Sequence, residues 1–294
     1  MSGAPRSHLY VPGDRADVLA KATSRRADAL IIDLEDAVAP SAKAAARESV
    51  AAFLRQQPAA GTAGPELWVR VNPGPVAVAD LRAVMAPALA GVCLAKTESR
   101  ADVEAVAALL DELEQQHHLA PGTITVAPLL ESAAAVLGVR EIAAAPRVSR
   151  LQVGEADLSA ELGVVLGADE RELLWVRSQV VLASAAAGIE PPVGPVSTNF
   201  ADLDALREST LSLQRMGYRS RACIHPAQVA VVNEVFTPTA EQLERARELV
   251  ERYDAAIDAG DGVFTDASGQ MVDLAVVRAA RRTVAAAHAS PEQP

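Results

Sequence analysis

Val126-Ala-Pro-Leu-Leu-Glu-Ser132 and Arg150-Leu-Gln-Val-Gly-Glu-Ala-Asp-Leu158 are the two segments that decide the fold of this chain. Each contains a short apolar run, which is typical of a parallel strand buried on both faces, and each ends in a carboxylate beside small residues. These carboxylates are Glu131 and Asp157. If the two strands are neighbours in a parallel sheet, both acids lie at one edge and form an oxygen site of the kind that holds Mg²⁺.

The same strand-then-helix pattern repeats along most of the chain. Eight short apolar runs alternate with helical segments, and they cover residues 8–12, 29–34, 67–72, 91–96, 123–131, 148–153, 194–196 and 221–225. Eight strands separated by helices is the count of a (β/α)8 TIM barrel, an α/β fold that suits a chain of 294 residues. We predict a catalytic barrel over residues 1–235. Residues 236–294 are predicted to be a C-terminal helical and hairpin extension that serves as a lid or an oligomer contact.

Composition and charge narrow the possible partners. The formal net charge of −11 argues against binding along a nucleic acid or an anionic membrane, so an anionic substrate would need a local group of Arg or Lys. No apolar run approaches the roughly 18 residues that span a bilayer. The two cysteines, Cys93 and Cys223, lie far apart inside apolar runs, which favours reduced thiols and a cytoplasmic protein.

Polar residues occur at the predicted exits of the strands, where the active site of a TIM barrel lies. In chain order they are Asp33, Glu35, Asp36, Arg70, Asn72, Lys96, Glu131, Asp157 and His225. Acids beside Arg and Lys suit a divalent metal together with a substrate that carries carboxylate or carbonyl oxygens.

Each of these residues also has a structural explanation when it is taken alone. Glu131 could favour the N-terminus of the following helix, and Asp157 could form an Asx turn before Leu158. Arg70 could bridge to one of the acids after the second strand without losing the ability to bind a substrate. His225 fits a hydrogen-bonded structural histidine better than a base. The joint pattern, rather than any single residue, favours a site.

Seven motifs in order along nearly the whole chain resemble the citrate lyase β-subunit family, within the wider HpcH/HpaI group of Mg²⁺-dependent aldolases and acyl-CoA lyases. They are Arg6-Ser-His-Leu-Tyr-Val-Pro-Gly13, Ile32-Asp-Leu-Glu-Asp-Ala-Val38, Trp68-Val-Arg-Val-Asn72, Lys96-Thr-Glu-Ser99, Leu130-Glu-Ser132, Gly154-Glu-Ala-Asp-Leu158 and Ala222-Cys-Ile-His-Pro226.

The resemblance implies roles for four residues. Glu131 and Asp157 would bind Mg²⁺, with Glu131 also facing the substrate, and Arg70 would hold the substrate's carboxylate. Gly269-Gln-Met-Val-Asp273 resembles the tail motif of malyl-CoA-type relatives, whose aspartate enters a neighbouring subunit's site as an acid/base group. Asp273 would then act in a homo-oligomer, for which the resemblance favours a trimer. Relatives often read Gly-Ala-Glu-Asp-Leu where this chain reads Gly154-Glu-Ala-Asp-Leu158, which leaves the role of Glu155 open.

The predicted activity is reversible, Mg²⁺-dependent cleavage of a 3-hydroxy-acyl thioester that carries a carboxylate. A substrate of the citryl-CoA or malyl-CoA type would give an acetyl thioester and a small oxo acid, and the carrier would be CoA or an acyl-carrier group. Two alternatives stay open: a malyl-CoA thioester hydrolase, and a lyase subunit active only with acyl-carrier and transferase partners. A pyruvate-type aldolase is less favoured because the long tail looks suited to covering a thioester.

Overall fold

The computed structural model describes residues 4–258, 264–265 and 271–288 of the chain. The chain divides into two compact units, one formed by Pro5–Glu234 and the other by the described residues of Met1–Ala4 and Val235–Pro294. None of the helices in the described ranges is both long enough and apolar enough to cross a lipid bilayer.

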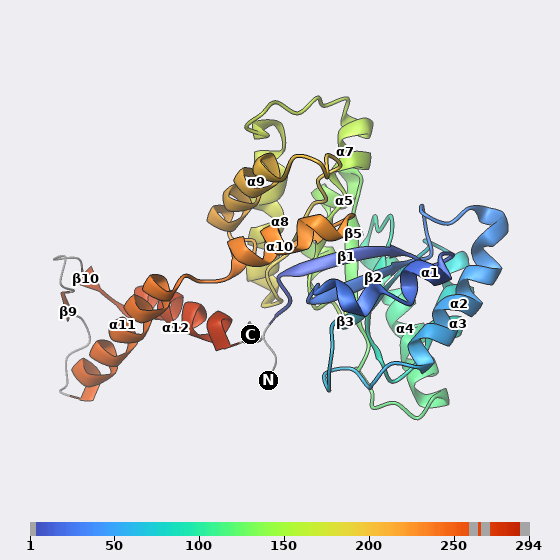
Figure 1. Ribbon diagram of the computed structural model, residues 1–294, viewed down its shortest axis with the longest axis horizontal. Helices are drawn as coiled ribbons and strands as arrows, with labels where there is room; N and C mark the ends of the chain where they lie inside the picture. The colour runs from blue at the N-terminus through green and yellow to red at the C-terminus, as the bar shows by residue number, and fades with distance from the viewer. Residues whose placement is uncertain (1–3, 259–263, 266–270, 289–294) are drawn as a thin grey trace. The chain divides into compact units, whose positions relative to one another are not determined.

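The first unit is a closed barrel of parallel strands, in which each strand pairs with the next along the chain and the last pairs with the first (Figure 1). The strands are β1 (Ser7–Pro12), β2 (Ala29–Asp33), β3 (Glu66–Val71), β4 (Leu89–Leu94), β5 (Thr125–Leu130), β6 (Gln152–Val153), β7 (Val193–Gly194) and β8 (Ser220–Cys223). The predicted (β/α)8 TIM barrel is confirmed.

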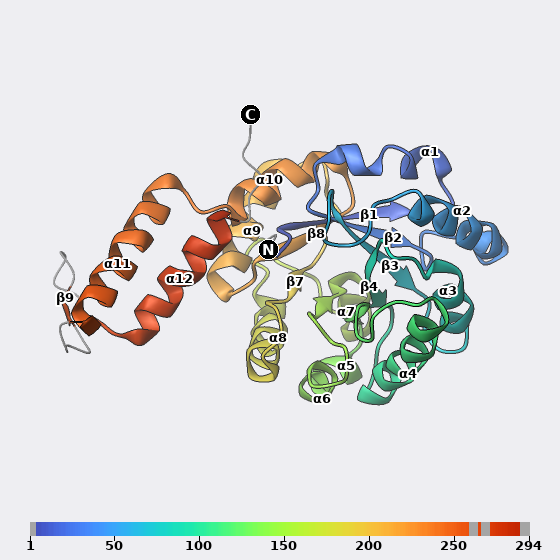
Figure 2. The ribbon, with the colours of Figure 1, turned by 90° about the horizontal axis from the view of Figure 1, so that it is seen from below.

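Helices surround these strands, as Figure 2 shows. They are α1 (Ala16–Leu19), α2 (Lys43–Arg55), α3 (Val76–Val84), α4 (Arg100–Gln116), α5 (Ala133–Leu137), α6 (Val139–Ala143), α7 (Glu155–Leu162), α8 (Leu174–Ala187), α9 (Leu203–Met216) and α10 (Pro226–Phe236). Where the sequence predicts one helix over residues 132–144, the structure has α5 and α6, which meet at Gly138. Glycine is a poor residue inside a helix because it loses the most backbone freedom on folding.

Small and aliphatic side chains of the barrel interior pack around the ring of Trp68. Trp68 projects inward among Ala29, Ile31, Cys93 and other small or aliphatic side chains. Its ring fits because position 91 of the neighbouring strand is glycine, where an added Cβ would lie 2.3 Å from the indole. A chain with only 3 % aromatic residues therefore fills its core by pairing rare large side chains with small ones.

A buried carboxylate on α3 fixes the exit of β3, beside the predicted site. Asp80 is fully buried and accepts hydrogen bonds from the Asn72 backbone N–H (2.9 Å), the Asn72 Nδ2 (2.7 Å) and the Arg47 Nε (2.6 Å). The Asn72 Nδ2 also donates to the Leu34 carbonyl oxygen, 2.8 Å away. Asp80 thus joins α2, α3 and the segments that follow β2 and β3.

Asp80→Ala is expected to lower the free energy of unfolding by about 3 kcal/mol, because it leaves the Arg47 guanidinium and the Asn72 donors without their buried acceptor. Urea denaturation measures this change. Glu104→Ala is a suitable control, since Glu104 is exposed and, in the described part of the chain, forms a surface ion pair with Arg100 on α4. The control should stay within about 0.5 kcal/mol of the unmodified protein, and equal losses in the two variants would refute the assigned role of Asp80.

The second unit contains two long helices and a short pair of antiparallel strands. The elements are α11 (Ala240–Asp258), β9 (Phe264–Thr265), β10 (Met271–Val272) and α12 (Leu274–His288), and α11 and α12 lie side by side in both views (Figures 1 and 2). Tyr253, Val272 and Val277 form their shared core, and Arg281 pairs with Asp254 at 2.6 Å. The predicted helical and hairpin extension is therefore present. Its service as a lid or an oligomer contact stays a prediction.

Candidate active site

The sequence-predicted residues of the barrel lie at the carboxyl ends of its strands. Asp33 ends β2 and is paired in register with Arg70 of β3. Lys96 follows β4 by two residues, and Glu131 directly follows β5. Because all the strands are parallel, these side chains share one end of the barrel, which is the end that carries active sites in this fold.

Arg70 is held in a fixed orientation by a neighbouring carboxylate. Its Nε and Nη2 donate to the two oxygens of Asp33 at 2.7 and 2.6 Å, and its Nη1 lies 3.1 Å from Glu35. Its Cζ lies 5.2 Å from the centre of the Tyr10 ring. Burial lowers the pKa of Arg70, but the hydrogen bonds and charge of Asp33 outweigh burial and raise this pKa above its usual value. The guanidinium therefore stays charged, and its Nη1, which is not bound to Asp33, faces Glu35.

Lys96 connects the acids after β2 with the acid after β5. Its Nζ lies 2.5 Å from Glu35 and 3.3 Å from Asp36, while its backbone N–H donates to the Glu131 Oε2 at 2.8 Å. Its φ of 49° is in the left-handed region, which is uncommon for a residue other than glycine. In that conformation Lys96 contacts three acids, two through its Nζ and one through its backbone N–H. The hydrogen bond with Glu35 raises the pKa of Lys96.

Glu131 is a buried carboxylate with a shifted pKa. Burial raises its pKa to about 7, and the charge of Asp157 adds to that rise, while the Lys96 backbone N–H and Arg70 oppose it. Gly154, which precedes α7, packs directly against this side chain, since an added Cβ would lie 2.5 Å from the Glu131 Cγ. The charge of Asp157, near the exit of β6, thus acts on Glu131 at the exit of β5.

The donor set of this pair fits Mg²⁺. A buried carboxylate and an exposed one that repel each other gain from a hard cation between them, and Mg²⁺ in proteins is commonly held by one or two carboxylates plus waters and substrate oxygens. Among the described residues no group of three or more His, Cys, Asp or Glu side chains is arranged to hold a metal. Glu131 and Asp157 would therefore leave most positions around the ion to waters and substrate.

The raised pKa of Glu131 predicts a pH dependence of stability. Between about pH 4.5 and 7 the folded chain retains a proton that the unfolded chain has released, so the contribution to stability is complete below pH 4.5 and is lost as pH rises through 7. In urea unfolding with a chelator present, the protein is expected to lose about 2 to 3 kcal/mol between pH 5 and 8 relative to Glu131→Gln, which does not titrate. A pH-independent difference between the two proteins would contradict this environment for Glu131.

Asp157 is an exposed residue in the first turn of α7. The alternative that Asp157 forms an Asx turn before Leu158 is wrong, because Asp157 already lies inside α7, which begins at Glu155. Glu155 itself is buried and pairs with Arg177 of α8, so the acid whose role the sequence left open points into the fold.

Several other sequence-predicted features have structural explanations. His225 accepts a hydrogen bond at Nδ1 from the Ala227 N–H (3.2 Å) and stacks on Phe200 with ring centres 5.0 Å apart. Cys93 and Cys223 are free and buried, and burial raises the pKa of each thiol to about 12. Both thiols are therefore protonated and inert at neutral pH.

Asp273 belongs to the second unit, where its carboxylate begins a helix. Its Oδ1 accepts from the backbone N–H groups of Ala275 (2.9 Å) and Val276 (3.1 Å) in the first turn of α12. Gly269 and Gln270 of the tail motif lie outside the described residues. A role for Asp273 in a neighbouring subunit stays a prediction, because the observed bonds are those of an ordinary helix cap.

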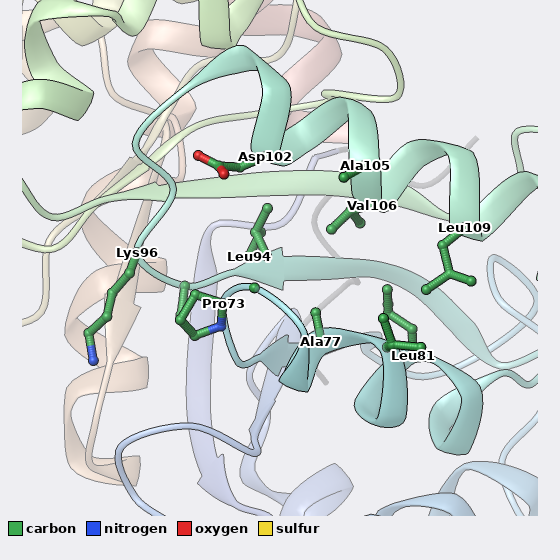
Figure 3. A pocket seen from close by; sticks show the side chains of 12 residues that line it. Pro73, Ala77, Leu81, Leu94, Lys96, Asp102, Ala105, Val106 and Leu109 are labelled. Carbon is green, nitrogen blue, oxygen red and sulfur yellow. The ribbon is translucent and has the colours of Figure 1, made fainter.

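A cavity of about 140 Å³ lies between α3 and α4, on the outer face of β4 (Figure 3). Its lining is mainly apolar and includes Leu81, Leu94 and Val106. The two charged residues on its border are already occupied, because Lys96 pairs with the acids after β2 and Asp102 accepts from Ser99. Neither Glu131 nor Asp157 lines this cavity.

Comparisons with known proteins agree with this arrangement. The family model described as HpcH/HpaI aldolase/citrate lyase matches residues 6–226, which span the barrel. The chain belongs to this family. It is 37 % identical over 279 residues to a citrate lyase subunit beta-like protein of Deinococcus radiodurans, covering 94 % of this chain and 95 % of that protein. It is 33 % identical over 286 residues to a (3S)-malyl-CoA thioesterase of Cereibacter sphaeroides, covering 97 % and 95 %.

A solved structure is similar to this chain over 98 % of its length. CitE of Mycobacterium tuberculosis, crystallised with magnesium, acetoacetate and coenzyme A, matches with a TM-score of 0.75 and 32 % identity, covering 98 % of this chain and 100 % of that one. The family predicted from the seven sequence motifs is therefore confirmed.

Within this aldolase/citrate lyase barrel, two connections were missing from the sequence-based prediction. The sequence placed Lys96 at a strand exit but gave it no role. Its bridge between Glu35 and Glu131 accompanies a left-handed backbone conformation, which is usually marked by a glycine, and position 96 is a lysine. The partner of Glu155 was not predicted either, since Arg177 lies 22 residues further along the chain. The one available signal was the position of Glu155 directly after a buried strand. An acid that is buried there needs a charged or hydrogen-bonding partner.

Proposed function

We propose that the chain is a Mg²⁺-dependent carbon–carbon lyase. Its substrate would be a 3-hydroxy-acyl thioester with a carboxylate, of the citryl-CoA or malyl-CoA type, and its products an acetyl thioester and an oxo acid. The observation that carries this proposal is the meeting of Arg70, Glu131 and the charge of Asp157 at one end of the barrel. Family membership supports it, and so does the CitE relative crystallised with magnesium, acetoacetate and coenzyme A.

Glu131 and Asp157 are the residues proposed to hold the Mg²⁺. When bound, the ion supplies Lewis acidity to the oxygen at the breaking bond and to the adjacent carboxylate oxygens. The backbone N–H of Lys96 restrains one oxygen of Glu131, which keeps that carboxylate in a fixed orientation.

Arg70 is proposed to bind the carboxylate of the oxo-acid portion. Asp33 holds the guanidinium plane from one side and Tyr10 lies against its face, so the remaining N–H groups present a rigid donor set. In the cleavage direction the 3-hydroxyl loses its proton, its carbon becomes the carbonyl of the oxo acid, and the C2–C3 bond breaks. The electron pair of that bond forms the enolate of the acetyl thioester, which takes up a proton at carbon.

Asp273 is the proposed acid/base group for the proton at the acetyl carbon. The tail motif supports this role by resemblance, and the role requires a second copy of the chain, with a trimer favoured. Asp273→Asn should then lower turnover far more than thioester binding. An unchanged turnover rate would remove Asp273 from the mechanism.

Product analysis tests the proposed reaction. The purified chain with Mg²⁺ and malyl-CoA or citryl-CoA should release acetyl-CoA and glyoxylate or oxaloacetate in equal amounts. Intact malate and free CoA would instead identify a thioesterase, an alternative that the Cereibacter sphaeroides relative supports. Turnover only after addition of acyl-carrier and transferase partners would identify a dependent subunit.

A further inference from the structure

A buried ion pair joins the start of α7 to α8. The Arg177 Nε and Nη2 donate to the two oxygens of Glu155, each at 2.6 Å, and the Arg177 Nη1 donates to Glu170 at 2.7 Å. The side chains of Arg177 and Glu155 are only 3 % and 8 % exposed. Such parallel, two-point geometry fixes both the separation and the relative orientation of the two groups.

The pair acts on the turn that carries Asp157. Glu155 is the first residue of α7 and Asp157 is the third, so both belong to the same helical turn. No side chain caps this helix at Gly154. The residue before the helix has no side chain of its own, and it packs against Glu131. Of the contacts described for this turn, the Glu155–Arg177 pair is the one with strict directional geometry.

Stability alone does not account for the pair. Removing two charges from water costs several kcal/mol, which their attraction repays only in part, so an apolar pair of similar volume would stabilise the fold at least as well. What a bidentate pair adds is a defined geometry. Glu155 lies two residues before Asp157, one of the proposed metal ligands. It directly follows Gly154, which packs against the other proposed ligand, Glu131.

We propose that Glu155 and Arg177 are positioning residues that set the Asp157 carboxylate at the correct distance from Glu131 for a divalent cation. This inference rests on the proposed function, because it takes Glu131 and Asp157 as the metal ligands. Neither Glu155 nor Arg177 touches the metal or the substrate. Loss of the pair shifts the first turn of α7, and the metal loses affinity although both of its ligands remain.

Titration with Mn²⁺, followed by the electron paramagnetic resonance signal of the free ion, measures that affinity without any substrate. The variants are Arg177→Met, Glu155→Gln and the double variant with both changes. Arg147→Met is the matched control, because Arg147 forms a similarly buried pair with Glu114 (2.6 Å) that secures Gly122 and Ile124, before the start of β5 rather than at its exit. Steady-state turnover at several Mg²⁺ concentrations provides a second readout.

Arg177→Met and the double variant are expected to weaken Mn²⁺ binding about tenfold or more, in the range found when residues that orient metal ligands are changed. Turnover should recover in large part at saturating Mg²⁺, so the metal concentration for half-maximal rate rises more than kcat falls. Arg147→Met should bind Mn²⁺ within about twofold of the unmodified protein. If Arg177→Met does not fold, Glu155→Gln decides, because it keeps the size of the side chain and one hydrogen bond while it removes the charge.

Asp157→Asn separates failure of this inference from failure of the proposed function. If Asp157→Asn binds Mn²⁺ as the unmodified protein does, the metal site itself is wrongly placed. If Asp157→Asn loses Mn²⁺ while the folded Glu155 and Arg177 variants keep full affinity, the metal site stands and the positioning role is overturned. Equal weakening in Arg147→Met would also overturn it, because the effect would then be general destabilisation.

Discussion

Glu131→Gln is expected to lower lyase turnover by about three orders of magnitude at any Mg²⁺ concentration. The amide keeps the size of the side chain, and its oxygen can still accept the Lys96 N–H. It removes the negative charge with which Glu131, together with Asp157, is proposed to hold the cation. A metal ion that stabilises charge at a reacting oxygen contributes several kcal/mol to the rate, and about 4 kcal/mol corresponds to a thousandfold change. Steady-state assays across a Mg²⁺ series measure the loss.

Glu98→Gln provides the control for that experiment. Glu98 follows β4 on the same side of the barrel as Lys96, but it is exposed and has no proposed role. Its activity should stay within about twofold of the unmodified protein. If Glu131→Gln keeps more than a tenth of the turnover, the assignment of Glu131 as a metal ligand is wrong.

Arg70→Lys is expected to reduce kcat/KM by two to three orders of magnitude even though the charge is conserved. A lysine cannot bond both oxygens of Asp33 while it presents further N–H groups in the same plane. The fixed donor set that we propose for the substrate carboxylate would therefore be lost. Asp33 would also keep only one imperfect hydrogen bond in place of two, which further lowers kcat/KM by disturbing the site. Arg100→Lys is the matched control, because Arg100 lies on the exposed start of α4 and pairs with Glu104.

The binding of an unreactive oxo acid to Arg70→Lys completes the test. The variant should bind pyruvate or acetoacetate far more weakly than the unmodified protein does, in the presence of saturating Mg²⁺. Unchanged binding of the oxo acid together with unchanged kcat/KM would show that Arg70 serves only as a bridge to Asp33.

The fold was predictable because the signal is local and repeated. Each buried strand appears in the sequence as a short apolar run, and each following helix shows apolar residues at helical spacing. The repeated alternation of these two patterns indicated a barrel. Prediction was less accurate where local chemistry is ambiguous. Gly138 divides one predicted helix into two, and α7 begins directly after β6, where the sequence suggested only a turn.

The candidate site was predictable only in part, for a physical reason. Arg70 and Glu131 stand out because a charged residue rarely ends an otherwise buried strand, and parallel strands place such residues at one end of the barrel. Lys96 and Arg177 act through contacts with residues far along the chain, and such contacts leave no periodic pattern in the sequence. Asp273 is different again, because its observed bonds explain it as a helix cap while its proposed role depends on another subunit.

The most direct test of the metal site is anomalous diffraction from crystals of the protein soaked with Mn²⁺ and an oxo acid such as oxaloacetate. A single strong peak between the carboxylates of Glu131 and Asp157, with the oxo acid reaching from the ion toward Arg70, is the predicted result. The rival location is the group of acids at the carboxyl end of β2, formed by Asp33, Glu35 and Asp36, which pairs with Arg70 and Lys96 in this structure. A peak on that group, or no peak between Glu131 and Asp157, would contradict the proposed site.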